Sequence, residues 1–258
     1  MSIFIALILG IIQGLTEFLP VSSSGHLVLL QNIFNIENNA ILFDIILHLG
    51  TLLAVIIVYR KSILEIIKNP FGKKMRFIVV GTIPTLIIAF LFKDFFENAF
   101  SGNLLFVGFL ATSLLLLIAD YVDKKCKNNK SMNYKSIITM GIFQGLAILP
   151  GLSRSGSTTT SSLVLGIKKD EALEYSFLLS IPIILASLLY ELIFSGSKIT
   201  SIEISPCIVG FIASLIFGII SIKFMKKLVK DKTYKYFAFY LIILSVFIIL
   251  NQFVFKLF

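Results

Sequence analysis

The sequence contains little charge and almost no cysteine, and each shortage excludes a class of protein. Of its 258 residues 57% are apolar and only 14% are charged. Soluble domains have roughly 25% charged residues, so an ordinary soluble domain is excluded. The two cysteines form no metal-binding motif and indicate no disulfide. No nucleotide-binding, zinc or serine-hydrolase motif occurs in a suitable context.

The first ten residues also lack a basic residue, so we expect no cleavable signal peptide. The net charge is nevertheless +9, because 23 residues are basic. Nearly all of them lie between apolar stretches, which indicates loops that face anionic lipid. Membrane lipids are therefore expected partners, and nucleic acid is not.

Uncharged apolar stretches recur along the chain at about the 20 residues that a bilayer span requires. The sequence predicts an all-α polytopic membrane protein with six plain spans, at residues 41–59, 77–92, 104–121, 173–194, 205–225 and 237–257.

Two further apolar stretches, 2–34 and 137–167, are interrupted in the middle. Each interruption contains proline, glycine and several serines, which break a helix and need polar surroundings. Each half has about 11 to 14 residues, too few to span a bilayer alone. A single kinked span is one interpretation, but a re-entrant helical hairpin fits the length better.

The two broken stretches resemble each other without gaps at an offset of 131 residues: Gln13-Gly14-Leu15 matches Gln144-Gly145-Leu146, and Ser22, Ser24 and Gly25 match Ser153, Ser155 and Gly156. This pattern indicates an internal duplication within one integral membrane domain. The first repeat covers 1–123 and the second 135–258, each with a hairpin followed by three spans. Three spans per repeat place the two repeats in inverted topology.

The loop charges give an independent test of this topology. The topology of hairpins and spans places 19 basic residues on one face of the membrane, in 60–76, 122–136, 168–172 and the region 223–235. Only Lys93, Lys198 and Lys256 lie on the other face. By the positive-inside rule the basic face is cytoplasmic, so both termini lie outside.

Ionisable groups inside apolar stretches are candidates for function by default. Glu17, His26 and Arg154 fall in the two broken stretches, with Ser22, Ser23, Ser24, Ser153 and Ser155 beside them. Arginine, hydroxyl groups and helix N-termini suit an anion with several oxygens, and phosphate is the obvious class. His26 is a candidate nucleophile or general acid, and Glu17 a candidate base or ligand to a hard cation.

Simpler interpretations stay open. Glu17 and Arg154 could form only a structural ion pair, the serines could only cap helices, and His26 could be a structural donor. Asp44 and His48 lie one helical turn apart in the first plain span. Such a pair is more often a satisfied hydrogen bond than a catalytic dyad, so neither residue is assigned to the site.

The two broken segments carry a family resemblance. The run Gln13-Gly14-Leu15-Thr16-Glu17-Phe18-Leu19-Pro20-Val21-Ser22-Ser23-Ser24-Gly25-His26-Leu27 and the run Leu149-Pro150-Gly151-Leu152-Ser153-Arg154-Ser155-Gly156-Ser157-Thr158 closely resemble the bacterial undecaprenyl-diphosphatase family, also called bacitracin resistance proteins. Similarity extends to the segment Phe43 to Thr51, to Gly81-Thr82-Ile83-Pro84 and to the segment Ser176 to Pro182, so it covers nearly the whole chain.

The resemblance implies hydrolysis of undecaprenyl diphosphate to undecaprenyl phosphate, which recycles the lipid carrier of cell-wall synthesis. It implies a polyprenyl diphosphate substrate, support by a divalent cation, Mg²⁺ or Ca²⁺, and a bacterial plasma-membrane protein with its site open to the outer face. A homodimer is a candidate assembly. The roles it carries over are catalytic for Glu17, His26 and Arg154, with a metal-associated role for Glu17. It also implies that Ser22 and Ser23 supply active-site hydroxyls and that Arg154 binds phosphate together with Ser153. Gln13 stands where some relatives have glutamate and cannot supply a second carboxylate.

The main rival is a polyprenyl-phosphate flippase or transporter, because inverted repeats with broken helices are a transporter architecture. An acid–base pair beside a phosphate-binding site favours chemistry over pure transport. An ion channel ranks last, since the sequence has no repeated filter and no ring of like charges.

Overall fold

A computed structural model describes residues 1–36, 40–125, 129–194, 203–231 and 234–255. Every regular element in these ranges is helical: α1 (Ile3–Phe18), α2 (Ser23–Ile33), α3 (Ala40–Val58), α4 (Arg60–Lys68), α5 (Lys73–Leu91), α6 (Lys93–Ala99), α7 (Leu105–Lys125), α8 (Tyr134–Leu146), α9 (Arg154–Val164), α10 (Lys169–Phe194), α11 (Ile204–Asp231), α12 (Tyr234–Leu250) and a π-helical turn (Asn251–Phe255). Among the basic residues used for the topology, Lys127, Lys198, Lys232 and Lys256 lie outside the described residues.

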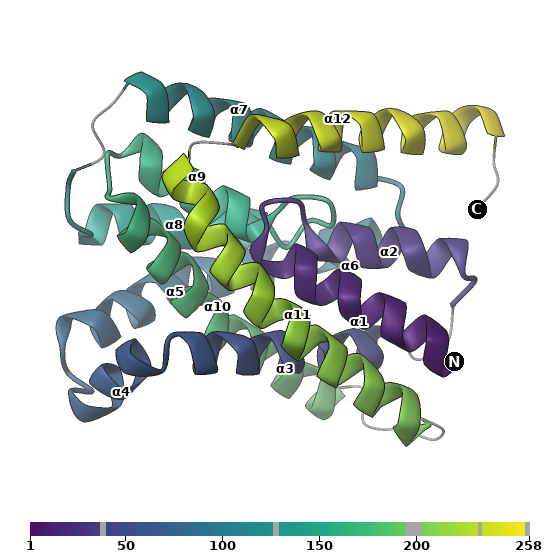
Figure 1. Cartoon of the computed structure of the whole chain (residues 1–258), viewed down its shortest axis with the longest axis horizontal. Helices are drawn as coiled ribbons and strands as arrows, with labels where there is room; N and C mark the ends of the chain where they lie inside the picture. Colours follow the sequence, from purple (N-terminus) through teal and green to yellow (C-terminus); the bar gives the residue numbers. More distant parts are fainter. Residues whose placement is uncertain (37–39, 126–128, 195–202, 232–233, 256–258) are drawn as a thin grey trace.

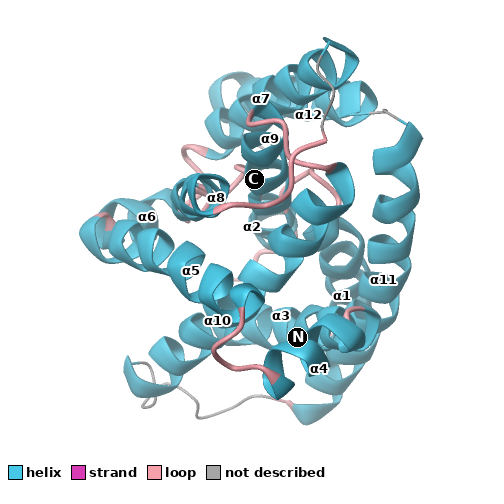
Figure 2. Ribbon diagram, turned by 90° about the vertical axis from the view of Figure 1, so that its left-hand side faces the viewer, coloured by secondary structure: helices cyan, strands magenta, loops and turns pink. Residues whose placement is uncertain are grey.

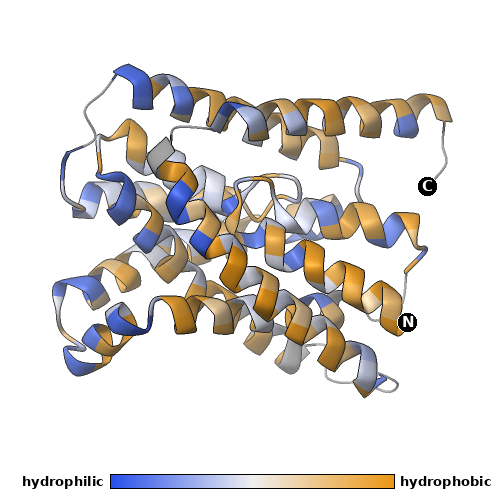
Figure 3. Ribbon diagram, viewed as in Figure 1, coloured by the Kyte–Doolittle hydropathy of each residue, from blue (hydrophilic) through white to orange (hydrophobic). Residues whose placement is uncertain are grey.

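Within the part of the chain that the structure describes, five helices are long and apolar enough to cross a membrane, namely α5, α7, α10, α11 and α12. Helix α3 passes the same test together with α4, although the two are bent by 79°. The surface of these helices is mainly apolar, as Figure 3 shows. The prediction of a multi-pass, all-α membrane protein is confirmed.

Both interrupted stretches fold as the sequence predicts, as a helix, a loop and a second helix. The first helix of each pair ends before the proline of its break: α1 at Phe18, two residues before Pro20, and α8 at Leu146, four residues before Pro150. Gly151, directly after the second proline, has a φ of 88°, a conformation that glycine adopts without the cost of a Cβ atom. Helices α1 and α2 pack on each other, as do α8 and α9 (Figure 1).

The two halves of the chain exchange packing partners. Helix α1 packs against α11 and α3, α8 packs against α5, and α7 lies beside α12 (Figures 1 and 2). Helix α1 approaches α11 through Gly10 and Gly14: a Cβ atom at Gly10 would lie 2.6 Å from the carbonyl oxygen of Gly210. Small residues four apart allow such close approach of membrane helices. The first break is thereby fixed against the second half.

The two ends of the molecule differ in polarity. The N-terminus and the end of α12 lie at the right of Figure 1, whereas α4 and the polar end of α7 lie at the left (Figure 3). Helices α4 and α6 were not predicted as separate helices. Helix α4 carries Arg60, Lys61 and Lys68 at the basic end and has no fully buried residue, but four of its nine residues are isoleucine or leucine, so it is an amphipathic helix.

Candidate functional site

The breaks between α1 and α2 and between α8 and α9 meet at one cavity of about 340 Å³. Six of the predicted site residues line it: Glu17, Ser22, Ser23, Ser24, Ser153 and Arg154. Much of the remaining wall is apolar, from Leu27, Ile45, Ile148, Leu152, Ile183 and Ile184. The cavity therefore combines a polar, partly charged wall with a surface suited to a hydrocarbon chain.

Glu17, in the last turn of α1, is the most extensively bonded residue of this cavity. Its Oε1 pairs with the guanidinium of Arg154. Its Oε2 accepts hydrogen bonds from Ser23 Oγ at 2.5 Å and from Gln13 Nε2 at 3.0 Å. The carboxylate is 7% exposed, so these partners compensate for much of its lost hydration.

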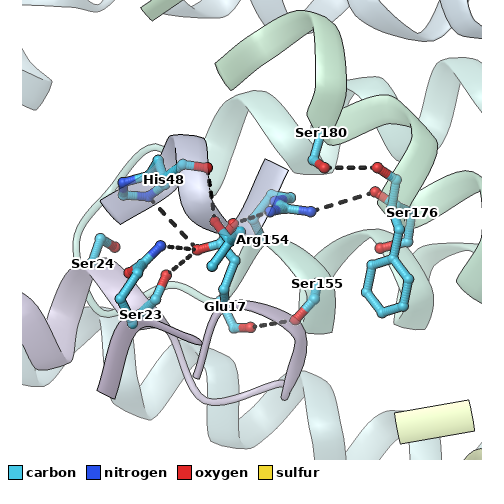
Figure 4. Close-up of polar contacts among 12 residues, drawn as sticks. Glu17, Ser23, Ser24, His48, Arg154, Ser155, Ser176 and Ser180 are labelled. Atoms are coloured by element: carbon cyan, nitrogen blue, oxygen red, sulfur yellow. Dashed lines mark hydrogen bonds and ion pairs between the residues drawn. The ribbon is translucent and has the colours of Figure 1, made fainter. Parts of the chain in front are cut away.

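Arg154 is the first residue of α9 and brings the second half of the chain to this carboxylate (Figure 4). Its second terminal nitrogen donates to the Ser176 carbonyl on α10 at 3.5 Å. A guanidinium has five N–H donors, so these contacts leave donors available to an anion in the cavity. The structural ion pair considered from sequence is present, and it lies inside the cavity.

The serines of the two breaks occupy equivalent positions. Ser22 Oγ accepts from the Gly25 N–H at 3.3 Å and caps α2, while Ser153 Oγ accepts from the Gly156 N–H at 3.1 Å and caps α9. Ser155 does not line the cavity; its hydroxyl donates to the Leu19 carbonyl and ties the two breaks together. The capping interpretation thus holds for Ser22 and Ser153.

His26 does not line the cavity. Its Nδ1 lies 2.7 Å from the Ser22 carbonyl oxygen, and its Nε2 lies 2.6 Å from the Tyr240 hydroxyl on α12. The ring stacks on Tyr240 and meets Phe109 edge to face. Both ring nitrogens are therefore occupied by protein groups, and the ring connects the first break to α12.

Two residues that were not assigned to the site, Asp44 and His48, do line the cavity. His48 Nε2 lies 3.6 Å from Glu17 Oε2 (Figure 4). The carboxylate of Asp44 accepts from Gln31 at 2.7 Å, while His48 Nδ1 bonds the Asp44 backbone carbonyl instead. The signal that could have identified both residues was their ionisable character inside a membrane span.

A divalent cation in this cavity would need oxygen atoms of the protein as ligands. Mg²⁺ is usually held by one or two carboxylates together with substrate phosphates. Both oxygens of Glu17 are engaged by protein groups, and the described residues contain no group of three histidine, cysteine or acidic side chains that could hold a metal. Without substrate, the arrangement seen here does not fit a metal ion ligated by Glu17, because such an ion would have to displace Arg154 or the hydrogen bonds from Ser23 and Gln13.

Known proteins of one family match nearly the whole chain. The profile of the family described as bacitracin resistance protein BacA matches residues 6–247. The chain belongs to this family.

Curated relatives agree with the family match. The chain is 44% identical to an undecaprenyl-diphosphatase of Carboxydothermus hydrogenoformans over 98% of each chain. It is 41% identical to undecaprenyl-diphosphatase 4 of Bacillus thuringiensis, over 96% of each chain. An undecaprenyl-diphosphatase of Halothermothrix orenii is 42% identical over 97% of this chain and 98% of its own.

Proposed function

We propose that this protein hydrolyses undecaprenyl diphosphate to undecaprenyl phosphate and inorganic phosphate, and that the cavity between the two helix breaks is its active site. The reaction recycles the lipid carrier of cell-wall synthesis and gives bacitracin resistance. One observation supports the placement most strongly. Glu17, Arg154 and the serines of both breaks converge on a cavity whose other wall is apolar. A lipid diphosphate needs both surfaces.

The diphosphate is held by positive potential from three sources. Arg154 presents its guanidinium donors, and α2 and α9 both begin at the cavity, where their first N–H groups and dipole ends favour an anion. The hydroxyls of Ser22, Ser24 and Ser153 add polar contacts to the phosphate oxygens. The isoprenoid chain lies along the isoleucine and leucine side chains of the same cavity.

Glu17 acts as the general base. It already accepts a hydrogen bond from a neighbouring hydroxyl, that of Ser23, so it is positioned to accept a proton from an oxygen that attacks phosphorus. The bond between the terminal phosphorus and the bridging oxygen then breaks, and undecaprenyl phosphate leaves with the bonding electrons. Arg154 stabilises the charge that develops on the phosphate oxygens.

His26 contributes by positioning. Ser22 has a φ of 67°, a conformation that is uncommon outside glycine, and His26 bonds its carbonyl oxygen. The ring therefore holds the turn that presents Ser22, Ser23 and Ser24 to the cavity. A divalent cation, Mg²⁺ or Ca²⁺, remains a proposal from the resemblance, and we assign it no chemical step.

We also propose the inverted-repeat topology, with two re-entrant hairpins, both termini outside and the cavity open toward the outer face. The exchanged packing of the two halves supports an inverted pair of repeats. Phe100 and Tyr190 support the outer opening, since both line the cavity: Phe100 directly follows α6 and Tyr190 lies near the end of α10, at span ends that the loop charges place outside.

Labelling of single cysteines tests this orientation, in a chain whose own two cysteines are replaced by serine. A cysteine at Ser2 should react with a membrane-impermeant maleimide in intact cells. A cysteine at Lys124 should react only after lysis. The reverse pattern would contradict the proposed topology.

Phosphate release tests the function itself. Purified protein in detergent should convert undecaprenyl diphosphate into equal amounts of inorganic phosphate and undecaprenyl phosphate. A protein that binds the lipid and moves it between leaflets of a vesicle without releasing phosphate would instead be the transporter considered from sequence.

A further inference from the structure

His48 lies in the middle of α3, and its ring approaches the same oxygen of Glu17 as the Ser23 hydroxyl does (Figure 4). It belongs to the cavity wall together with Glu17 and Arg154. Its contacts suit chemistry better than those of His26, the histidine to which the family resemblance gives a catalytic role.

One ring nitrogen of His48 is fixed by the backbone. Nδ1 lies 2.7 Å from the carbonyl oxygen of Asp44, one helical turn earlier. A carbonyl oxygen can only accept a hydrogen bond, so Nδ1 carries a hydrogen. In the neutral ring Nε2 is then an acceptor, and this is the nitrogen that faces Glu17.

The distance between His48 Nε2 and Glu17 Oε2 is 3.6 Å, which is too long for a direct hydrogen bond. Two acceptors cannot bond each other, but both can accept from one molecule that carries two hydrogens. Separations above about 3.5 Å are where a bridging water should be considered. Water is also the co-substrate of a hydrolysis, and the cavity holds the proposed phosphate-binding groups beside these two atoms.

We propose that His48 is a catalytic residue, whose Nε2 holds the attacking water together with Glu17 Oε2. The proposal rests on the function proposed above. The water oxygen forms a bond to the terminal phosphorus, and one of its protons passes to Glu17 Oε2 in place of the hydrogen bond from Ser23. The other proton stays on the water oxygen and donates a hydrogen bond to Nε2 during the attack. The bridging P–O bond breaks, and its electron pair leaves with undecaprenyl phosphate.

His26 cannot take this role in the same geometry. Its nitrogens bond Ser22 and Tyr240, and its ring packs between Phe109 and Tyr240 outside the cavity. To reach the cavity the ring would have to leave both hydrogen bonds. The two histidines of the chain therefore have different functions: His26 positions the turn and His48 contacts the reacting water.

The experiment compares two substitutions of His48 in purified, phosphate-releasing protein. His48→Gln keeps a side-chain acceptor, and His48→Leu keeps a similar volume without one. We expect His48→Leu to lower kcat by about 10²-fold or more with KM changed little, because the lost contact is to the water and not to the lipid. His48→Gln should retain kcat to within about tenfold, since its amide oxygen accepts the same hydrogen.

Two results would overturn the proposal: wild-type kcat in His48→Leu, or a loss in His48→Gln as large as that in His48→Leu. The latter would mean that the charge or shape of imidazole matters and not its acceptor. Thermal unfolding of both variants in detergent separates loss of chemistry from loss of folding. If wild-type protein itself releases no phosphate, the proposed function fails. If wild-type protein is active, the two variants test only the catalytic role of His48.

Discussion

The bond between His26 and Tyr240 gives a sharp prediction, because Tyr240→Phe removes a single oxygen atom. His26 is 7% exposed, and its Nε2 lies 2.6 Å from the Tyr240 hydroxyl. The substitution keeps the ring that stacks on the imidazole and leaves Nε2 without its partner. If His26 positions the Ser22 turn, the loss should appear mainly in stability.

The expected magnitude follows from the burial of His26. Leaving a buried polar group unsatisfied costs about 1–3 kcal/mol, so the free energy of unfolding should fall by that amount. The substitution leaves the cavity and Glu17 unchanged, so kcat should stay within about tenfold of the wild-type value. Loss of an acid–base group would lower kcat by about 10²-fold or more. A double-mutant cycle with His26→Leu should give a coupling energy of about 0.5–3 kcal/mol.

The assay combines thermal unfolding in detergent with the rate of phosphate release. Tyr236→Phe is the matched control, since Tyr236 lies one helical turn earlier on α12 and is 62% exposed. It should change neither quantity. The reasoning would be refuted if Tyr240→Phe left stability unchanged while kcat fell as far as in Glu17→Gln.

Three further predictions concern the second break, the anion contact and the metal. Gly151→Ala should lower the unfolding midpoint more than Gly166→Ala: both glycines have positive φ, but a Cβ at Gly151 would lie 2.5 Å from the Leu105 carbonyl oxygen, whereas one at Gly166 meets only the Lys130 side chain at 3.5 Å. Equal losses would contradict this packing. Arg154→Lys should lower kcat/KM by about 10- to 100-fold, because charged hydrogen bonds contribute about 1.5–3 kcal/mol and an ammonium lacks the planar fork; unchanged steady-state kinetics would contradict it. EDTA should stop phosphate release and Mg²⁺ or Ca²⁺ restore it, yet calorimetry should detect no tight metal binding without substrate, since both oxygens of Glu17 are engaged; a tight substrate-free site would contradict this expectation.

Local features made the two breaks predictable. In each break a proline and a glycine stand among several serines, a combination that favours the end of a helix, and serine caps the helix that follows. Ser22 and Ser153 are equivalent in the duplication, and each accepts from the N–H three residues later. The proximity of Glu17 and Arg154 could also be predicted, because charged groups inside a membrane protein usually pair with one another.

Long-range packing made the roles of the histidines unpredictable. His26 turns away from the cavity because Tyr240, 214 residues later, bonds it there. His48 reaches Glu17 only because α3 packs beside α1. Helix α4 was missed for a different reason. A charged segment directly after a span is usually predicted as a loop, and the 79° bend between α3 and α4 is visible only in the structure.

The most direct test compares two glutamates in the same phosphate-release assay. Glu17 lies in the cavity, whereas Glu174 bonds Ser62 and Lys74 and is not part of its wall. Wild-type protein and Glu174→Gln should both release phosphate from undecaprenyl diphosphate, and folded Glu17→Gln should be slower by about 10²- to 10⁴-fold. A Glu17→Gln variant that works at the wild-type rate would contradict the assignment of this cavity as the active site.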